Sequence, residues 1–255
     1  MVISELPIGS IVQFGRYQMG HMTCTTDIKW IKVSNENHFI SEKVLLGAVF
    51  DAYESNWRTN NDYLLSNIRQ FMNSDISNWY TPTHRYDKEM GYIFFDETGY
   101  TINMNRYDGL LHHFTDEELS AFELQPFTGD FLRLPTEREI AGGFPYFKKH
   151  GRKAYHEPEY GSLERKGYHD GMFASYYVID EMQEVPNGDV GEINRSGRFR
   201  RIWPHMYSGV RPVCKLRADR KVTQITENTY KMNLSSETPV KYFEETQSLD
   251  WLLGL

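Results

Sequence analysis

The sequence predicts an α+β fold in which short helices pack on mostly antiparallel strands that long irregular loops connect. Aromatic residues make up 15% of the 255-residue chain, with 17 Tyr and 15 Phe, as is typical of a globular protein with a substantial core. Short runs rich in β-branched residues recur along the chain, whereas few segments show the three-and-four spacing of apolar residues that a helix needs. The length suits one large domain, alone or with an appendage.

Composition excludes several classes of protein. The 28 basic and 35 acidic residues give a formal net charge of −7, which opposes nonspecific binding to DNA or to an anionic membrane. No run approaches the roughly 18 apolar residues of a membrane span, and the first residues lack the pattern of a signal peptide. Cys24 and Cys214 are too few for the disulfides of a secreted lectin, although they can pair if the terminal strands adjoin. We therefore expect a protein that has no membrane span and is cytoplasmic when made.

The N-terminal part is predicted to be a meander of strands. Ile11–Phe14 and Ile28–Val33 mix apolar and polar residues at the short spacing of half-buried strands. His38–Leu46 continues this pattern after a turn at Asn35–Asn37.

Two segments are predicted to be helical. Apolar residues spaced three and four apart place one face of Asp62–Met72 toward the core, including Leu64 and Leu65, and Asn61 or Asp62 can cap its start. A helix of about three turns is expected from Thr115, because acidic residues fill its first turn.

A strand ending at Leu134 is predicted to pass directly into a helix. Pro135 stops the strand, and Thr136 with Glu139 has the spacing of a capping box. Residues 142–171 then combine Gly, Tyr, His and charge without periodicity, so we expect a long irregular loop there. Loops of that length usually serve function.

A hairpin and a last strand close the predicted domain. Tyr176–Ile179 and Val190–Asn194 have the pattern of two strands joined by a turn at Pro186–Asp189, and Val210–Leu216 is the final strand. The domain is therefore predicted to span residues 1–216.

The composition changes after Arg217 toward Thr, Glu, Lys and Ser, so residues 217–255 are predicted to be an appendage. Its end, residues 249–255, is apolar. Either this end covers a groove of the core, or it binds a partner or a second copy of the chain, which leaves a homo-oligomer open.

Two segments carry a resemblance to a known superfamily. Arg133–Glu139, with the sequence RLPTERE, resembles the segment that opens a helix in formylglycine-generating enzymes and related sulfatase-modifying factors. Ser208–Val213 is similar to the ending of the last strand in those proteins. The resemblance implies a C-type-lectin-like fold over about residues 10–216.

A closer resemblance is to an uncharacterised bacterial and phage domain family. It rests on the order and spacing of four segments, which are Ile28–Ile31, Val44–Leu46, Asn67–Asn73 and Val210–Val213. Proteins with this fold include the variable proteins of diversity-generating retroelements, which present a binding surface just before the final strand. The resemblance thus implies ligand recognition.

The chain departs from the catalytic members of the superfamily. Formylglycine-generating enzymes bind copper through two nearby cysteines in the C-terminal part, where this chain has only Cys214. The calcium-binding triplets of sugar-binding C-type lectins are absent from the sequence as well. Oxidase chemistry is therefore not expected.

A cluster of arginines interleaved with aromatic residues precedes the last predicted strand. Arginine beside aromatic rings suits stacking on a sugar, a base or a protein hot spot. We call residues 195–207 the arginine–aromatic segment. Its candidate ligand-binding residues are Arg195, Arg198, Arg200, Arg201, Trp203, His205 and Tyr207, with Phe199 and Arg211 alongside. The alternative is a solvated loop whose arginines pair with acidic residues, while Trp203 and Tyr207 pack beneath it.

Calcium is the metal that the sequence suggests testing first, and no other cofactor is expected. Asn187, Asp189, Glu192 and Asn194 place hard oxygen ligands on or near a turn, although the same residues suit an ordinary hairpin turn. The nine histidines, His112 and His113 among them, include no pair with the i, i+4 spacing of a metalloprotease. A histidine metal site is therefore not favoured.

The sequence leads to the hypothesis of a non-catalytic recognition protein of phage or bacterial origin that binds a protein or glycan. It would act as a virion-associated tail or receptor-binding component, or as an inhibitor of a host defence factor. The alternative is a metal-dependent enzyme that uses residues 142–171, with His156, Glu159, His169 and Asp170 as working groups. A nucleic-acid binder is a third hypothesis, against which the net charge counts.

Overall fold

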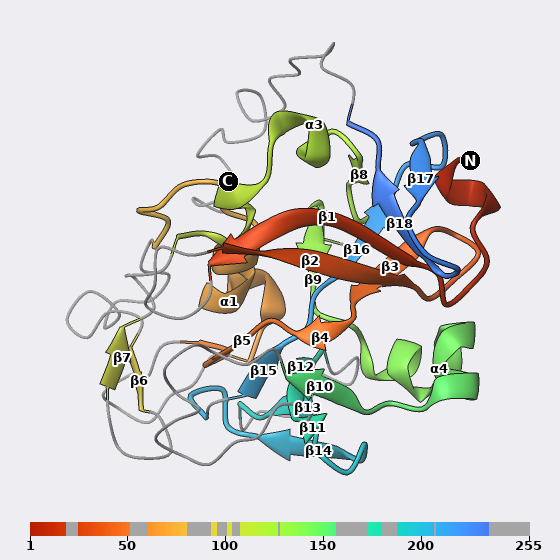
Figure 1. Ribbon diagram of the computed structural model, residues 1–255. Coiled ribbons are helices and arrows are strands. Elements are labelled where there is room, and N and C mark those ends of the chain that lie inside the picture. Colours follow the sequence, from red (N-terminus) through yellow and green to blue (C-terminus); the bar gives the residue numbers. More distant parts are fainter. Residues whose placement is uncertain are drawn as a thin grey trace.

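Figure 1 shows a computed structural model of the chain, which describes residues 1–18, 25–51, 61–80, 93–95, 101–103, 108–126, 128–156, 173–179, 188–206 and 208–234. Within these ranges strands predominate and helices are short, so the predicted α+β class is confirmed. None of the helices in these ranges is long and apolar enough to cross a membrane.

The helical elements are single turns or little more. In chain order they are the 3-10 helices η1 (Ile3–Glu5) and η2 (Tyr63–Leu65), the α-helix α1 (Asn67–Met72), the 3-10 helix η4 (Leu110–His113), the α-helix α3 (Asp116–Leu119), the π-helical turn η5 (Glu139–Gly143) and the α-helix α4 (Pro145–His150).

The strands are also short. They are β1 (Ile11–Gln18), β2 (Thr25–Lys32), β3 (His38–Ser41), β4 (Lys43–Val44), β5 (Leu46–Ala48), β6 (Ile93–Phe95), β7 (Thr101–Asn103), β8 (Phe122–Glu123), β9 (Leu132–Arg133), β10 (Ala154–His156), β11 (Phe173–Ala174), β12 (Tyr176–Val178), β13 (Val190–Ile193), β14 (Phe199–Ile202), β15 (Ser208–Val210), β16 (Val213–Leu216), β17 (Val222–Gln224) and β18 (Thr229–Met232).

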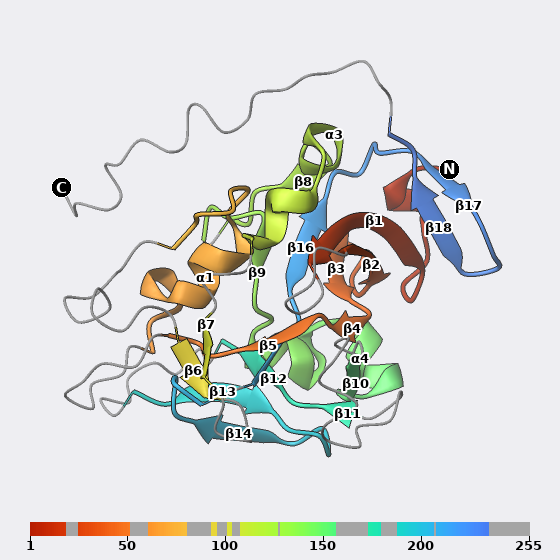
Figure 2. The ribbon, with the colours of Figure 1, turned by 60° about the vertical axis from the view of Figure 1, so that its left-hand side comes forward.

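The first sheet has the strand order β17-β18-β1-β2-β3-β16-β8, and β9 also pairs with β16. Its pairs are antiparallel except that β18 runs parallel to β1. Trp30 of β2 is fully buried, stacks on Phe14 at a ring-centroid distance of 5.5 Å, and donates its indole N–H to the Phe14 carbonyl over 3.1 Å. This sheet, with α1 and α3 against it, encloses the main core (Figure 2).

Two further sheets continue from the first. The second has the order β11-β10-β4 and the third the order β14-β13-β12-β15-β5, with β12 and β15 parallel to each other. A separate hairpin pairs β6 with β7. Figure 1 places the third sheet at the opposite end of the molecule from β17 and β18.

The predicted single strand His38–Leu46 is divided among all three of these sheets, as β3, β4 and β5. The predicted final strand is divided as well, because β15 lies in the third sheet and β16 in the first. Both segments pass from one sheet to another at the same place. There the Ser41 N–H donates to the Pro212 carbonyl over 3.0 Å, and Nε of Arg211 donates to the Ser41 carbonyl over 3.0 Å. Pro212 has no N–H for a ladder, so β15 and β16 separate there.

The prediction of a single helix at Asp62–Met72 is wrong, because this segment forms two short helices. Ser66 has extended backbone dihedrals and divides it into η2 and α1, with Asp62 capping the first and Ser66 capping the second. Leu64 and Leu65 are therefore 40% and 52% exposed instead of facing the core.

The predicted helix after Thr115 is present as α3 but is shorter than expected. The capping box forms between Thr115 and Glu118. Glu118 is buried and also accepts the Gly15 N–H over 2.7 Å, which ties the helix start to β1. The chain then turns into β8, which begins at Phe122, so the helix has about one turn instead of about three.

The direct passage from strand to helix near Leu134 is confirmed. The Thr136 N–H donates to Oε2 of Glu139 over 2.9 Å, and the Glu139 N–H donates to the Thr136 hydroxyl over 3.2 Å. The prediction of an irregular loop over residues 142–171 is wrong for residues 145–156, because they include α4 and β10. Residues 157–172 lie outside the described part of the chain.

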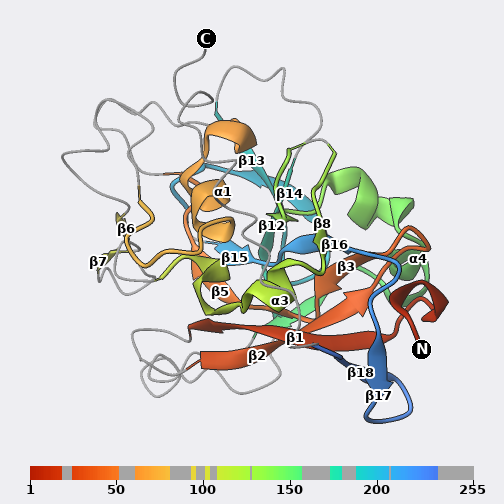
Figure 3. The ribbon, with the colours of Figure 1, turned by 90° about the horizontal axis from the view of Figure 1, so that it is seen from above.

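The predicted hairpin pairs as expected, with β12 antiparallel to β13. Residues 186 and 187 of its turn lie outside the described ranges. The chain does not leave the fold after residue 216, since β17 and β18 extend the first sheet. Figures 2 and 3 show these two strands beside the N-terminal segment. Residues 249–255 are not described.

Candidate functional site

The arginine–aromatic segment begins with a tight turn that Asn194 closes. The Asn194 side-chain oxygen accepts the backbone N–H groups of Ser196 and Arg198, each over 3.0 Å. The segment then forms β14, which pairs with β13 and lies at the edge of the third sheet as far as that sheet is described. The alternative of a solvated loop over residues 195–201 is therefore wrong for residues 199–201, which lie in β14.

Trp203 is the most prominent exposed side chain of this segment. It follows β14 directly, is 56% exposed, and lies near the His205 ring at 5.5 Å between centroids. The arginines of the segment are exposed too, and they are Arg195, Arg198, Arg200 and Arg201. Met206 adds a further apolar side chain that is 44% exposed. Trp203 therefore does not pack beneath the segment, and Tyr207 lies outside the described residues.

Arg200 of the segment has an acidic partner on the neighbouring strand. Arg200 lies directly opposite Glu192 of β13 and forms an ion pair with it. The Glu192 side chain is only 1% exposed, and it also accepts the Ser208 hydroxyl over 2.7 Å. Arg200 therefore has a structural role besides the ligand-binding role that the sequence suggested.

Arg211 and His205 do not add positive charge to this surface, although the sequence placed both among its basic residues. Arg211 is 2% exposed and lies over the Tyr176 ring at 5.1 Å, so it belongs to the core. Burial lowers the pKa of His205 from its ordinary value, so this ring adds no charge at neutral pH. The positive charge at the surface comes from the exposed arginines.

The candidate calcium ligands are only partly described, because Asn187 lies outside the described residues. Asp189 is partly buried and its carbonyl accepts the Asn61 amide over 3.4 Å. Glu192 and Asn194 already bind Arg200 and the turn, respectively. Calcium binding through Asn187 and Asp189 remains a prediction.

The working groups suggested for a metal-dependent enzyme are not placed by the structure. His156 contributes its backbone to β10, where it pairs with Val44. Glu159, His169 and Asp170 lie outside the described residues. The described residues therefore do not test the enzyme hypothesis.

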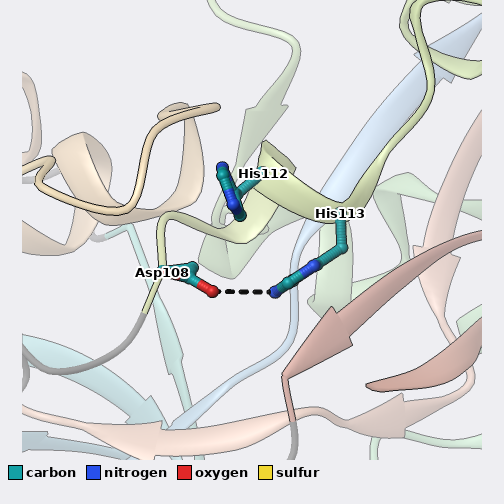
Figure 4. Close-up of side chains that lie close together, drawn as sticks. All are labelled: Asp108, His112 and His113. Carbon is teal, nitrogen blue, oxygen red and sulfur yellow. Dashed lines mark ion pairs between the residues drawn. The ribbon is translucent and has the colours of Figure 1, made fainter. Parts of the chain in front are cut away.

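A cluster that the sequence reasoning missed lies before and within η4 (Figure 4). Asp108, His112 and His113 each offer one metal-ligand atom, and these three atoms lie within 4.8 Å of one another. The signal was present in the spacing, since Asp108 and His112 are four residues apart. The metalloprotease pattern at that spacing requires two histidines, and here an aspartate takes the first position.

The comparisons with known proteins give no relative. No family model matches the chain, and no curated protein or solved structure matches it significantly.

Proposed function

We propose that this protein is a non-catalytic recognition protein that binds an acidic glycan or an acidic protein surface through the arginine–aromatic segment. The observation that carries the proposal is the 56% exposure of Trp203 beside exposed arginines at the edge of the third sheet. A tryptophan exposed to this degree buries a large apolar area when a ligand covers it.

The chemistry of the segment favours an anionic ligand. A guanidinium group binds carboxylate or sulfate through two parallel hydrogen bonds, and an indole ring stacks on the apolar face of a sugar or on a peptide side chain. The net charge of −7 belongs to the chain as a whole. The exposed arginines therefore concentrate positive charge on a protein that otherwise repels anions.

The fold and origin suggested by the resemblance form part of this proposal. The arginine–aromatic segment lies between β13 and β15, just before the chain closes with β16. In the variable proteins of diversity-generating retroelements, the region just before the final strand carries the binding surface. We infer the same arrangement here, in a chain of phage or bacterial origin.

The test is a double substitution that leaves the Glu192 ion pair intact. Arg201→Ala with Trp203→Ala removes one exposed guanidinium and the exposed indole while keeping Arg200. A matched control, Arg217→Ala with Ile225→Ala, removes an arginine that is 41% exposed and an isoleucine that is 51% exposed. Ile225 directly follows β17, which lies at the opposite end of the molecule from the third sheet (Figure 1). All three proteins are applied to an array of sulfated, sialylated and neutral glycans and of acidic and basic proteins.

The wild-type protein and the control are expected to bind acidic members of the array. The Arg201 and Trp203 variant should bind them at least tenfold more weakly, a loss of about 1.4 kcal/mol or more. Equal binding by the variant and the control would refute the site, and wild-type binding to no acidic member would refute the proposed ligand class.

A further inference from the structure

We propose that Asp108, His112 and His113 form a binding site for a divalent transition-metal ion, with zinc as the first ion to test. The three ligand atoms lie within 4.8 Å of one another (Figure 4). None of these residues belongs to the arginine–aromatic segment, so the site is independent of the proposed recognition function.

The backbone that carries the cluster is held firmly against the turn after α1. The Gly109 N–H donates to the Ile76 carbonyl over 3.0 Å, and the Leu111 N–H donates to the Ser74 carbonyl over 2.9 Å. Leu110 and Leu111 are buried at 2% and 0% exposure, which anchors η4 in the core. The metal-ligand side chains therefore project from a fixed element, as a preorganised site requires.

His112 has the proton arrangement of a metal ligand. Its Nδ1 lies 2.7 Å from the Asp75 carbonyl oxygen. A carbonyl oxygen only accepts hydrogen bonds, so Nδ1 carries the proton and Nε2 keeps its lone pair. Histidines that bind metals usually donate their other ring N–H to a carbonyl or carboxylate in this way, which fixes both the tautomer and the ring orientation.

His113 and Asp108 already have a spacing close to that of two ligands of one ion. Nε2 of His113 lies 3.1 Å from Oδ2 of Asp108. This nitrogen is buried, yet it has no aligned hydrogen-bond partner among the described residues. Two ligands on a tetrahedral zinc ion, each about 2.0–2.1 Å from the metal, are about 3.3 Å apart. Small side-chain rotations would therefore suffice to bring the two atoms onto one ion.

The donor set points to a class of ion. Two imidazoles and one carboxylate suit zinc and its first-row neighbours better than calcium or magnesium, which prefer oxygen ligands. His112 is exposed, so water or a small anion can complete the coordination from the solvent side. The competing interpretation is an ordinary ion pair between Asp108 and protonated His113, with His112 solvated.

The test uses the full chain freed of metal by a chelator and titrated with zinc alone, in competition with a chromophoric chelator. The variants are His112→Ala and Asp108→Asn, which change an exposed and a partly exposed side chain. His150→Ala is the control, because it removes another exposed histidine, one that stacks on Tyr146 instead of contributing to the cluster. Circular dichroism verifies that each variant is folded.

We expect one zinc ion per wild-type chain, with the affinity lowered at least tenfold by either cluster variant and unchanged in the control. Zinc should also raise the Tm of the wild type and the control, but not of His112→Ala, because ligand binding stabilises the folded state alone. Absence of one-to-one zinc binding by the wild type overturns the proposal. Binding that both cluster variants retain in full overturns it too.

Discussion

A buried carboxylate links the arginine–aromatic segment to the rest of the third sheet. Oε2 of Glu192 accepts from Arg200 and Oε1 accepts from the Ser208 hydroxyl. Removing Arg200 therefore takes the ion-pair partner from a buried carboxylate, and removing Glu192 takes the acceptor from the buried Ser208 hydroxyl. We predict that Glu192→Ala and Arg200→Ala each lower the free energy of unfolding by about 1–3 kcal/mol. Arg201→Ala, at an exposed position on the same strand, should change it by less than about 0.5 kcal/mol.

Urea denaturation of the three variants measures these differences. Equal effects of Arg200→Ala and Arg201→Ala would contradict the structural role assigned to Arg200. The comparison also tells which arginines can be replaced in binding experiments without weakening the fold.

His38 gives the protein a pH dependence with a definite sign. Its side chain is 13% exposed and Nδ1 lies 3.0 Å from the Ser34 hydroxyl. Burial, and then the positive charge of Arg133, lower the pKa of His38 below its ordinary value of 6.5. The unfolded chain therefore binds the proton first, and the stability that His38 contributes is present above about pH 6.5 and is lost as the pH falls toward the lower folded pKa.

The substitution His38→Gln removes this titration. Between pH 7.5 and pH 5.5 the free energy of unfolding of the wild type should fall by more than that of the variant, by up to about 1 kcal/mol. Urea denaturation at the two pH values gives both differences. An identical fall in the two proteins would exclude His38 as a source of the dependence.

At the scale of the elements, the close approach of η4 to the turn after α1 depends on a glycine. A Cβ at Gly109 would lie 2.4 Å from the Ser74 carbonyl oxygen, which is backbone and cannot rotate away. We predict that Gly109→Ala destabilises the protein by about 2–3 kcal/mol. Gly129→Ala is the comparison, because a Cβ at Gly129 would meet no atom within 4 Å. Its loss of stability, about 1–2 kcal/mol, would come from the φ of +71° alone.

Thermal or urea denaturation distinguishes the two variants. If Gly109→Ala cost no more than Gly129→Ala, η4 would have to be free to move away from the turn. The metal site proposed for Asp108 and His112 would then lose its fixed framework.

Local signals in the sequence predicted where elements begin better than where they end. The capping box predicted at Thr136 forms, and the helix predicted from Thr115 begins there with a capping box of its own. Both starts depend on hydrogen bonds between residues only three positions apart. The helix lengths were overestimated, because tertiary contacts decide them. Asp51, distant in sequence, accepts the Asn67 N–H over 2.9 Å at the start of α1, and Glu118 reaches Gly15 on β1.

The division of two predicted strands between sheets could not have been found from the sequence alone. It depends on the pairing of Ser41 with Arg211 and Pro212, residues about 170 positions apart. For the same reason, only part of the candidate site could be predicted from the sequence. The sequence placed Arg201 and Trp203 together, but only the pairing of β13 with β14 shows that Arg200 is bound to Glu192.

At the scale of the whole molecule, residues 217–234 are predicted to be necessary for the fold. β18 supplies the parallel partner of β1, and the Ile3 N–H donates to the Arg220 carbonyl over 2.9 Å. Val222, Tyr230 and Met232 are at most 5% exposed. A chain ending after residue 216 should lose at least about 3 kcal/mol of stability, since burial of each such side chain contributes about 1.5–3 kcal/mol.

A chain ending after Leu234 retains every described contact and is the reference for this measurement. Urea denaturation of the two chains gives the difference directly. Equal stability would mean that β17 and β18 are dispensable, contrary to their place in the first sheet.

Position-specific cross-linking shows whether the ligand contacts the surface around Trp203. A photoreactive amino acid replaces Trp203 in one protein and the exposed Ile225 in another. Ile225 directly follows β17, which lies at the opposite end of the molecule from the third sheet (Figure 1). Each protein is illuminated with the acidic ligand that the wild type binds. We expect a cross-link from position 203 and none from position 225. A cross-link from position 225 that equals or exceeds the one from position 203 would contradict it.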